Sequence, residues 1–78
     1  MSRDIRDIER EITQAASWAA KWRKLEEEAL VVASAMRDVE ARRQMLFISE
    51  AYRLLAGRAE ERRERLVACA AAVKRGPC

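Results

Sequence analysis

The chain has 78 residues, with 16 Lys and Arg against 13 Asp and Glu, two cysteines and no histidine. A chain of this length forms one domain whose single core contributes only about 3–5 kcal/mol, so self-association is expected. Without histidine the commonest general base and imidazole metal ligand are missing, and two cysteines lack the paired spacing of a zinc site. We therefore expect a protein that is not an enzyme and holds no cofactor or metal.

The composition is that of a helical protein. Half of the residues are hydrophobic, 37% are charged, and there are two Gly and one Pro. No segment alternates apolar and polar residues as a strand does, and no signal peptide or apolar run of spanning length is present. Two cysteines do not make a secreted disulfide framework, so we expect a cytoplasmic protein that does not enter membranes.

The first predicted helix covers about residues 3–36, and Ser2 or Asp4 can cap its start. Apolar or small residues recur there at spacings of three and four, which is typical of a helix packed on another helix. These residues are Ile5, Ile8, Ile12, Ala15, Ala19 and Trp22. After Trp22 the pattern steps by three to Leu25 and continues through Ala29, Val32, Met36 and Val39. The step predicts local overwinding and would turn Glu26 outward.

The connection is hard to place because no Gly or Pro occurs before Gly57. Asp38 followed by Glu40 resembles an N-cap with an acidic first turn, and Ser34 and Ser49 are competing caps. We predict a turn at about 37–41, with a first helix that runs on to Leu46 as an alternative. A second helix follows at about 40–75, and residues 76–78 form a frayed tail.

The second helix contains the longest apolar pattern. Its members lie three or four residues apart, with Arg62 as the one charged position: Met45, Ile48, Tyr52, Leu55, Ala59, Leu66, Cys69 and Val73. The pattern passes Gly57 without changing phase, which favours one long helix. The sequence thus predicts an all-α, antiparallel two-helix hairpin resembling a coiled coil, which dimerises into a four-helix bundle. The alternative is a three-helix bundle with a break near Gly57.

Charge differs between the two predicted helices. Residues 1–40 carry seven basic and nine acidic side chains, and residues 41–78 carry nine basic and four acidic ones. A hairpin centred near residue 40 places residues opposite one another when their numbers sum to about 80. Arg62 then faces Trp18 and Arg58 faces Trp22, so each arginine either stacks on an indole or points to solvent.

Apolar surface exceeds what one neighbouring helix can cover, and it gathers on both sides of the turn. The residues that we expect to form a partner or dimer interface are Leu30, Val31, Val32, Met45, Leu46, Phe47, Ile48, Tyr52, Leu54 and Leu55. Large exposed apolar patches usually mark interaction sites. The surface is either the core of a homodimer or a groove for another protein.

The main functional expectation is a protein–protein interaction module that acts as a stoichiometric inhibitor, adaptor or assembly component. The alternative is an accessory protein that binds nucleic acid, or blocks a nucleic-acid site, through the arginine-rich second half. Glutamates interrupt the basic faces there, whereas a phosphate-tracking stripe is coherent. The consecutive Glu26, Glu27 and Glu28 point in different directions around a helix and do not converge on one cation.

Overall fold

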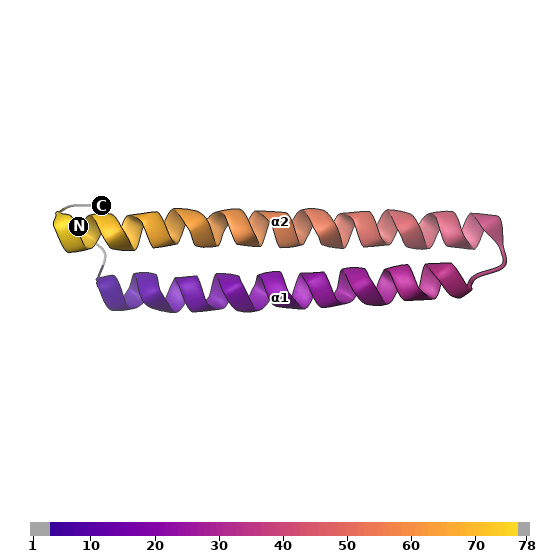
Figure 1. Cartoon of the computed structure of the whole chain (residues 1–78), viewed down its shortest axis with the longest axis horizontal. Helices are drawn as coiled ribbons and strands as arrows, with labels where there is room; N and C mark the ends of the chain where they lie inside the picture. Colours follow the sequence, from indigo (N-terminus) through magenta and orange to yellow (C-terminus); the bar gives the residue numbers. More distant parts are fainter. Residues whose placement is uncertain (1–3, 77–78) are drawn as a thin grey trace.

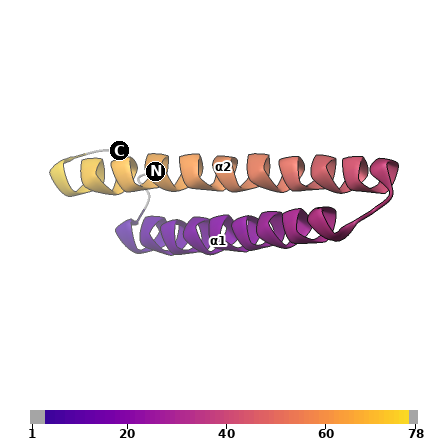
Figure 2. The same ribbon diagram turned by 45° about the vertical axis from the view of Figure 1, so that its right-hand side comes forward.

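Two long helices form an antiparallel hairpin in the computed structural model, which describes residues 4–76 (Figure 1). Helix α1 spans Ile5–Ala35 and α2 spans Val39–Arg75. They stay side by side when the view is turned by 45° (Figure 2), and the Cα atoms extend over 57 × 16 × 13 Å. The predicted all-α hairpin is confirmed. The three-helix alternative is wrong, because α2 continues through Gly57.

Both helices begin at an aspartate cap. The Asp4 carboxylate accepts a hydrogen bond from the Arg6 backbone N–H at 3.0 Å, and the Asp38 carboxylate accepts one from the Glu40 N–H at 3.1 Å. Each aspartate satisfies a donor that the first helical turn leaves without an intrahelical partner. Ser2, the other predicted cap of the first helix, lies outside the described residues.

The turn consists of residues 36–38, so it starts and ends earlier than the predicted interval of 37–41. Met36 donates its backbone N–H to the Ala33 carbonyl at 3.2 Å. Arg42 then donates to the Met36 carbonyl through Nε at 3.2 Å and through Nη2 at 2.5 Å. A side chain from the first turn of α2 thus closes the end of α1, which explains how so short a connection works without Gly or Pro.

The buried core is thin and made mostly of small side chains. Its members are Ile8, Ala15, Ala19, Ala29, Ala33, Ser49, Ala56, Leu66 and Ala70. Ile8 and Leu66 are the large ones, and they pack with Ala15, Ala70 and partly buried neighbours near the chain ends. Alanines between the helices allow the backbones to approach closely, and they leave little apolar volume between them.

The buried face of α1 differs from the predicted one beyond Trp22. Ala33 is 2% exposed while Val32 is 43% exposed, and only 17% of the Glu26 side chain is accessible. The buried pattern therefore continues from Trp22 through Glu26 to Ala29 and Ala33. The predicted step after Trp22 is therefore wrong. Glu26 continues the buried pattern, and its carboxylate forms an ion pair with Arg23.

One row of the predicted apolar pattern of α2 faces α1 as predicted, with Leu66 buried and Met45, Tyr52, Ala59 and Val73 partly buried, whereas the other row is displaced by one residue. Ser49 is buried where Ile48 was predicted, and Ala56 is buried where Leu55 was predicted. Arg62, the charged interruption of that seam, has 57% of its side chain exposed. Small residues face α1, and the larger Ile48 and Leu55 lie beside the contact.

Candidate interaction surface

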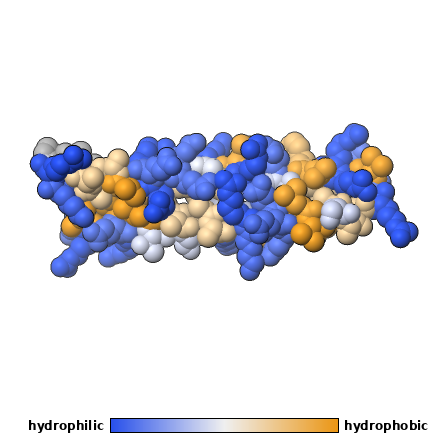
Figure 3. All heavy atoms as spheres, viewed as in Figure 1, coloured by the Kyte–Doolittle hydropathy of each residue, from blue (hydrophilic) through white to orange (hydrophobic). Residues whose placement is uncertain are grey.

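The half of the hairpin nearest the turn exposes most of the large apolar side chains. We call residues 20–57 the turn half, and residues 4–19 together with 58–76 the terminal half. Eight of the ten exposed large hydrophobic residues within 4–76 lie in the turn half: Leu30, Val31, Val32, Val39, Leu46, Phe47, Ile48 and Leu54. The other two are Trp18 and Val67. On the side seen in Figure 3, hydrophobic spheres gather toward the turn and near the opposite end, with hydrophilic ones between them.

The residues expected at the interface do not share one environment. Met45, Tyr52 and Leu55 are partly buried along α1. Phe47 and Val31 are the most exposed, at 78% and 68%. Because Phe47 and Leu54 are seven residues apart, they lie above one another on the outer side of α2, away from buried Ser49 and Ala56. The turn half thus exposes apolar groups both beside the helix contact and on its outer surface.

Three aromatic rings form a continuous stack across the two helices. Trp18 and Trp22 have ring centroids 5.9 Å apart, and Trp22 and Tyr52 have centroids 5.8 Å apart, each pair with an interplanar angle of 22°. Lys21 places its Nζ 4.8 Å from the centroid of the Trp18 ring. Stacked rings at this spacing attract one another beyond the area that they bury.

The four residues of the expected arginine–tryptophan stacks come together around one cavity. Trp18, Trp22, Arg58 and Arg62 line it together with Ala15 and Ala59. Arg62 also lies 3.9 Å from a Glu11 carboxylate oxygen. Stacking of Arg62 on Trp18 and of Arg58 on Trp22 stays a prediction, since the cation placed over Trp18 in the structure is Lys21.

Apolar side chains form two antiparallel rows on one flank of the helix contact. Seven residues make two helical turns, so Glu11, Trp18, Leu25 and Val32 lie in one row of α1. Ile48, Leu55 and Arg62 form the matching row of α2. The Glu11–Arg62 ion pair and the cavity shared by Trp18 and Arg62 place both rows on the same side. We call the five apolar members of these rows the aromatic flank: Trp18, Leu25, Val32, Ile48 and Leu55.

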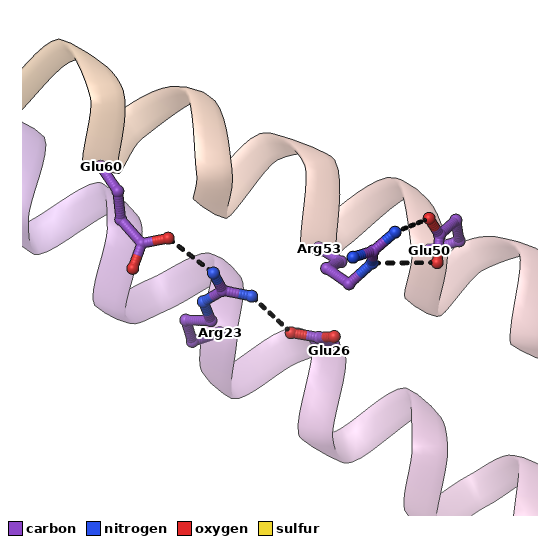
Figure 4. A network of polar contacts seen from close by, with 5 residues as sticks. All are labelled: Arg23, Glu26, Glu50, Arg53 and Glu60. Atoms are coloured by element: carbon purple, nitrogen blue, oxygen red, sulfur yellow. Dashed lines mark hydrogen bonds and ion pairs between the residues drawn. The ribbon is translucent and has the colours of Figure 1, made fainter.

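The opposite flank carries a charged network in its middle (Figure 4). Arg23 donates to Glu60 across the helices at 2.6 Å and to Glu26 on its own helix at 3.1 Å. Arg53 donates to Glu50 through Nε at 3.1 Å and also through Nη2. Leu30 lies seven residues after Arg23 in the same row of α1, and Leu46 lies seven residues before Arg53 in the same row of α2. This flank mixes apolar and paired charged groups.

The network changes the acidity of its members. The hydrogen bond from Arg53 lowers the pKa of the Glu50 carboxyl below its ordinary value, although partial desolvation acts in the other direction. The hydrogen bond to Glu60, and next that to Glu26, raises the pKa of Arg23. The hydrogen bond to Glu50 likewise raises the pKa of Arg53. These groups are exposed to solvent, so the shifts indicate pairing and carry little stabilisation.

The charged pairs differ from those that the predicted register sets opposite one another. A register sum of about 80 predicted Lys21 opposite Glu60 and Glu27 opposite Arg53. In the structure Glu60 accepts from Arg23, and Arg53 pairs with Glu50 on its own helix. A long arginine side chain reaches over a helical turn. The sum of two residue numbers therefore predicts which turns of the helices lie near each other, and it does not predict which side chains pair.

Leu25 and the Tyr52 ring contact were not singled out as members of an aromatic surface. The seven-residue spacing of Trp18, Leu25 and Val32 was a signal that could have identified the row. It was hidden because Leu25 and Val32 were predicted in the buried pattern and Trp18 in a stack with Arg62.

Within residues 4–76, no group of three Asp, Glu, Cys or His side chains is placed so as to hold a metal ion. Neither helix contains a stretch apolar enough to cross a bilayer, over the same residues. No protein-family model, curated protein or solved structure matches this chain.

Proposed function

We propose that this chain is a protein–protein interaction module that acts as a homodimeric four-helix bundle. It binds other proteins through the apolar surface of its turn half, and it works as a stoichiometric inhibitor, adaptor or assembly component in the cytoplasm. The observation that carries the proposal is the concentration of eight exposed large hydrophobic residues in the turn half. Patches of this kind usually mark interaction sites.

The thin core supports self-association. Within residues 4–76 the hairpin buries only Ile8 and Leu66 among its large side chains, so it gains little from the hydrophobic effect. A second hairpin would cover part of the exposed surface, and every copy of the chain offers the same surface. Light scattering of the unmodified chain at high micromolar concentration tests this part, and a monodisperse monomer would contradict it.

Binding to another protein is tested with immobilised chain and native host extract, followed by mass spectrometry. Leu54→Asp should abolish specific retention, because it puts a charge on the outer apolar surface. Val67→Asp is the matched control, since Val67 is a comparably exposed apolar residue of α2 in the terminal half. Equal retention by both variants would rule out the turn half as the binding surface.

Nucleic-acid binding is the alternative function, and the charges of α2 give it less support. Arg43, Arg53 and Arg62 each lie within 4.0 Å of a carboxylate oxygen. A paired arginine neutralises fewer phosphates than its formal charge suggests. Retention of DNA or RNA that falls steeply and linearly with the logarithm of salt concentration would favour this alternative over the protein-binding one.

A further inference from the structure

We infer that the aromatic flank is the face on which a second copy of this chain docks, with the two turns at the same end of the bundle. The inference rests on the proposed homodimer and specifies its contact surface and orientation. It makes Trp18, Leu25, Val32, Ile48 and Leu55 the dimer seam, and it leaves the outer side of α2 open.

The two flanks differ in the charges that lie between their apolar side chains. On the aromatic flank, the row of α1 from Trp18 to Val32 and the row of α2 from Ile48 to Leu55 contain apolar side chains alone. The opposite flank has the Arg23–Glu60 and Arg53–Glu50 hydrogen bonds between its apolar residues, and a docking helix would have to desolvate or break them. Burying paired charges is costly, so the aromatic flank is the better face for a helix contact.

The spacing of the apolar residues and the size of this side of the hairpin favour the same face. Residues that recur every seven positions keep facing a neighbouring helix that has the same repeat, and this chain has that repeat in both helices. The broad side of the hairpin measures 57 × 16 Å between Cα atoms, or roughly 900 Å² in projection. A stable interface needs roughly 800 Å² from each partner. A second hairpin laid along the whole of this side, charged terminal rows included, therefore has room for a contact of that size.

Orientation follows from the charges at the terminal end of the rows. A twofold axis along the helices puts α1 of one copy over α2 of the other, with both turns at one end. Glu11 of one copy then approaches Arg62 of the other at the same level, and the apolar rows meet each other. Turning one hairpin end for end would instead set Glu11 near the apolar rows of the turn half. The arrangement with both turns at one end is favoured, because it brings opposite charges together and places apolar groups against apolar groups.

Such a dimer keeps a second surface free. Phe47 and Leu54 lie on the outer side of α2, away from the aromatic flank, so a second hairpin on that flank does not cover them. Self-association and binding to another protein then use different residues of the same turn half.

The first test compares neighbouring substitutions of the same kind. Val32→Asp and Ile48→Asp should raise the dimer dissociation constant at least tenfold, measured by sedimentation equilibrium. Val31→Asp and Phe47→Asp should change it less than threefold, because those side chains point away from the flank. Circular dichroism shows whether each variant stays helical. If the outer pair weakens the dimer as much as the flank pair, the assigned face is wrong.

The tryptophans give a second readout that needs no substitution. Both tryptophans of the chain contribute to the aromatic stack, and Trp18 is half exposed in the single hairpin. Diluting the unmodified dimer should shift tryptophan emission to longer wavelength together with the loss of mass. Dissociation with unchanged emission would overturn the inference while leaving the homodimer itself intact, whereas a monomer at every concentration would overturn both.

Orientation is tested by a spin label encoded at Ser34, which leaves both cysteines in place. Ser34 lies 14 residues from the middle of α1, or about 21 Å along the axis. Turns at opposite ends would separate two labels by at least about 40 Å, whereas turns at the same end bring them within roughly 30 Å. Electron–electron distance measurement separates these outcomes, and the longer distance would overturn the orientation.

Discussion

The terminal half buries Ile8 and Leu66 between its helices, whereas the turn half buries Ala29, Ala33, Ser49 and Ala56. In the terminal half large side chains fill the space inside the hairpin, and these buried groups gain the hydrophobic stabilisation. In the turn half the fully buried side chains are small, Trp22 and Tyr52 stack across the helices while partly buried, and most of the large aliphatic side chains are exposed. The terminal half therefore has a core of large side chains, whereas the turn half leaves most of its large apolar groups exposed.

Truncating a large buried residue of the terminal half should have the largest effect. We expect Leu66→Ala to lower the free energy of unfolding by about 2–5 kcal/mol, because it leaves a cavity beside Ile8 and Ala15. Urea denaturation measures the loss. Val67→Ala, at the exposed neighbouring position, should cost much less. Equal losses would mean that the terminal half has no specific core.

Enlarging a buried residue should damage the turn half. Ala56 is 0% exposed, so Ala56→Leu should force the helices apart and cost about 1–3 kcal/mol. Ala51→Leu is the control, since Ala51 is exposed on the same helix. Thermal unfolding followed by circular dichroism gives both values. Tolerance of leucine at residue 56 would show that close approach is not what holds this half together.

Gly57 lies where the two halves meet on α2, and a Cβ added there meets nothing within 4 Å. Gly57→Ala should therefore stabilise the chain by up to about 1 kcal/mol, because glycine in a helix interior is unfavourable relative to alanine. The urea midpoint should rise. Ala51→Gly should move it in the opposite direction by a similar amount. A decrease for Gly57→Ala would show that the glycine is needed for contact with a partner chain.

The charged network of the turn half should give the smallest effect. Because the folded state lowers the pKa of Glu50 below 4.5, its pairing with Arg53 stabilises the fold above that pH. The contribution is lost as the pH falls from the ordinary carboxyl value of 4.5 through the lowered pKa. Urea midpoints across this range should fall slightly less for Glu50→Gln than for the unmodified chain. Identical slopes would mean that the pair is not formed in solution.

The comparison also shows which parts of the structure a sequence can predict. The hairpin, the uninterrupted α2 and the Asp38 cap followed from spacing and capping chemistry, because these depend on neighbours within a few residues. The buried side of each helix followed only in part: the predicted residues up to Trp22 on α1 and Leu66 on α2 are buried or partly buried, whereas Val32 and Ile48 are exposed. Ile48 is more hydrophobic than Ser49, and Leu55 more than Ala56, yet the smaller residue is buried in each pair. Close approach of two backbones favours small volume over hydrophobicity, and residue spacing cannot reveal that approach.

The position of the turn was predicted only to within a few residues for a similar reason. Arg42 holds the Met36 carbonyl by two hydrogen bonds, a contact between residues six apart across a change of direction. Propensity treats Arg42 as an ordinary helix residue. The partners of the charged residues could not be predicted either, because an arginine side chain can reach several carboxylates.

The start of α1 and the end of α2 lie at the same end of the hairpin (Figure 1), which is 57 Å long. A fluorescent protein or an affinity handle joined at either place would be held at the opposite pole from the turn. The hairpin would then present the apolar residues of its turn half at the far end from whatever it is attached to. Arrays of such hairpins on a surface or scaffold would display the turn halves outward, in a position to capture a protein without interference from the anchoring layer.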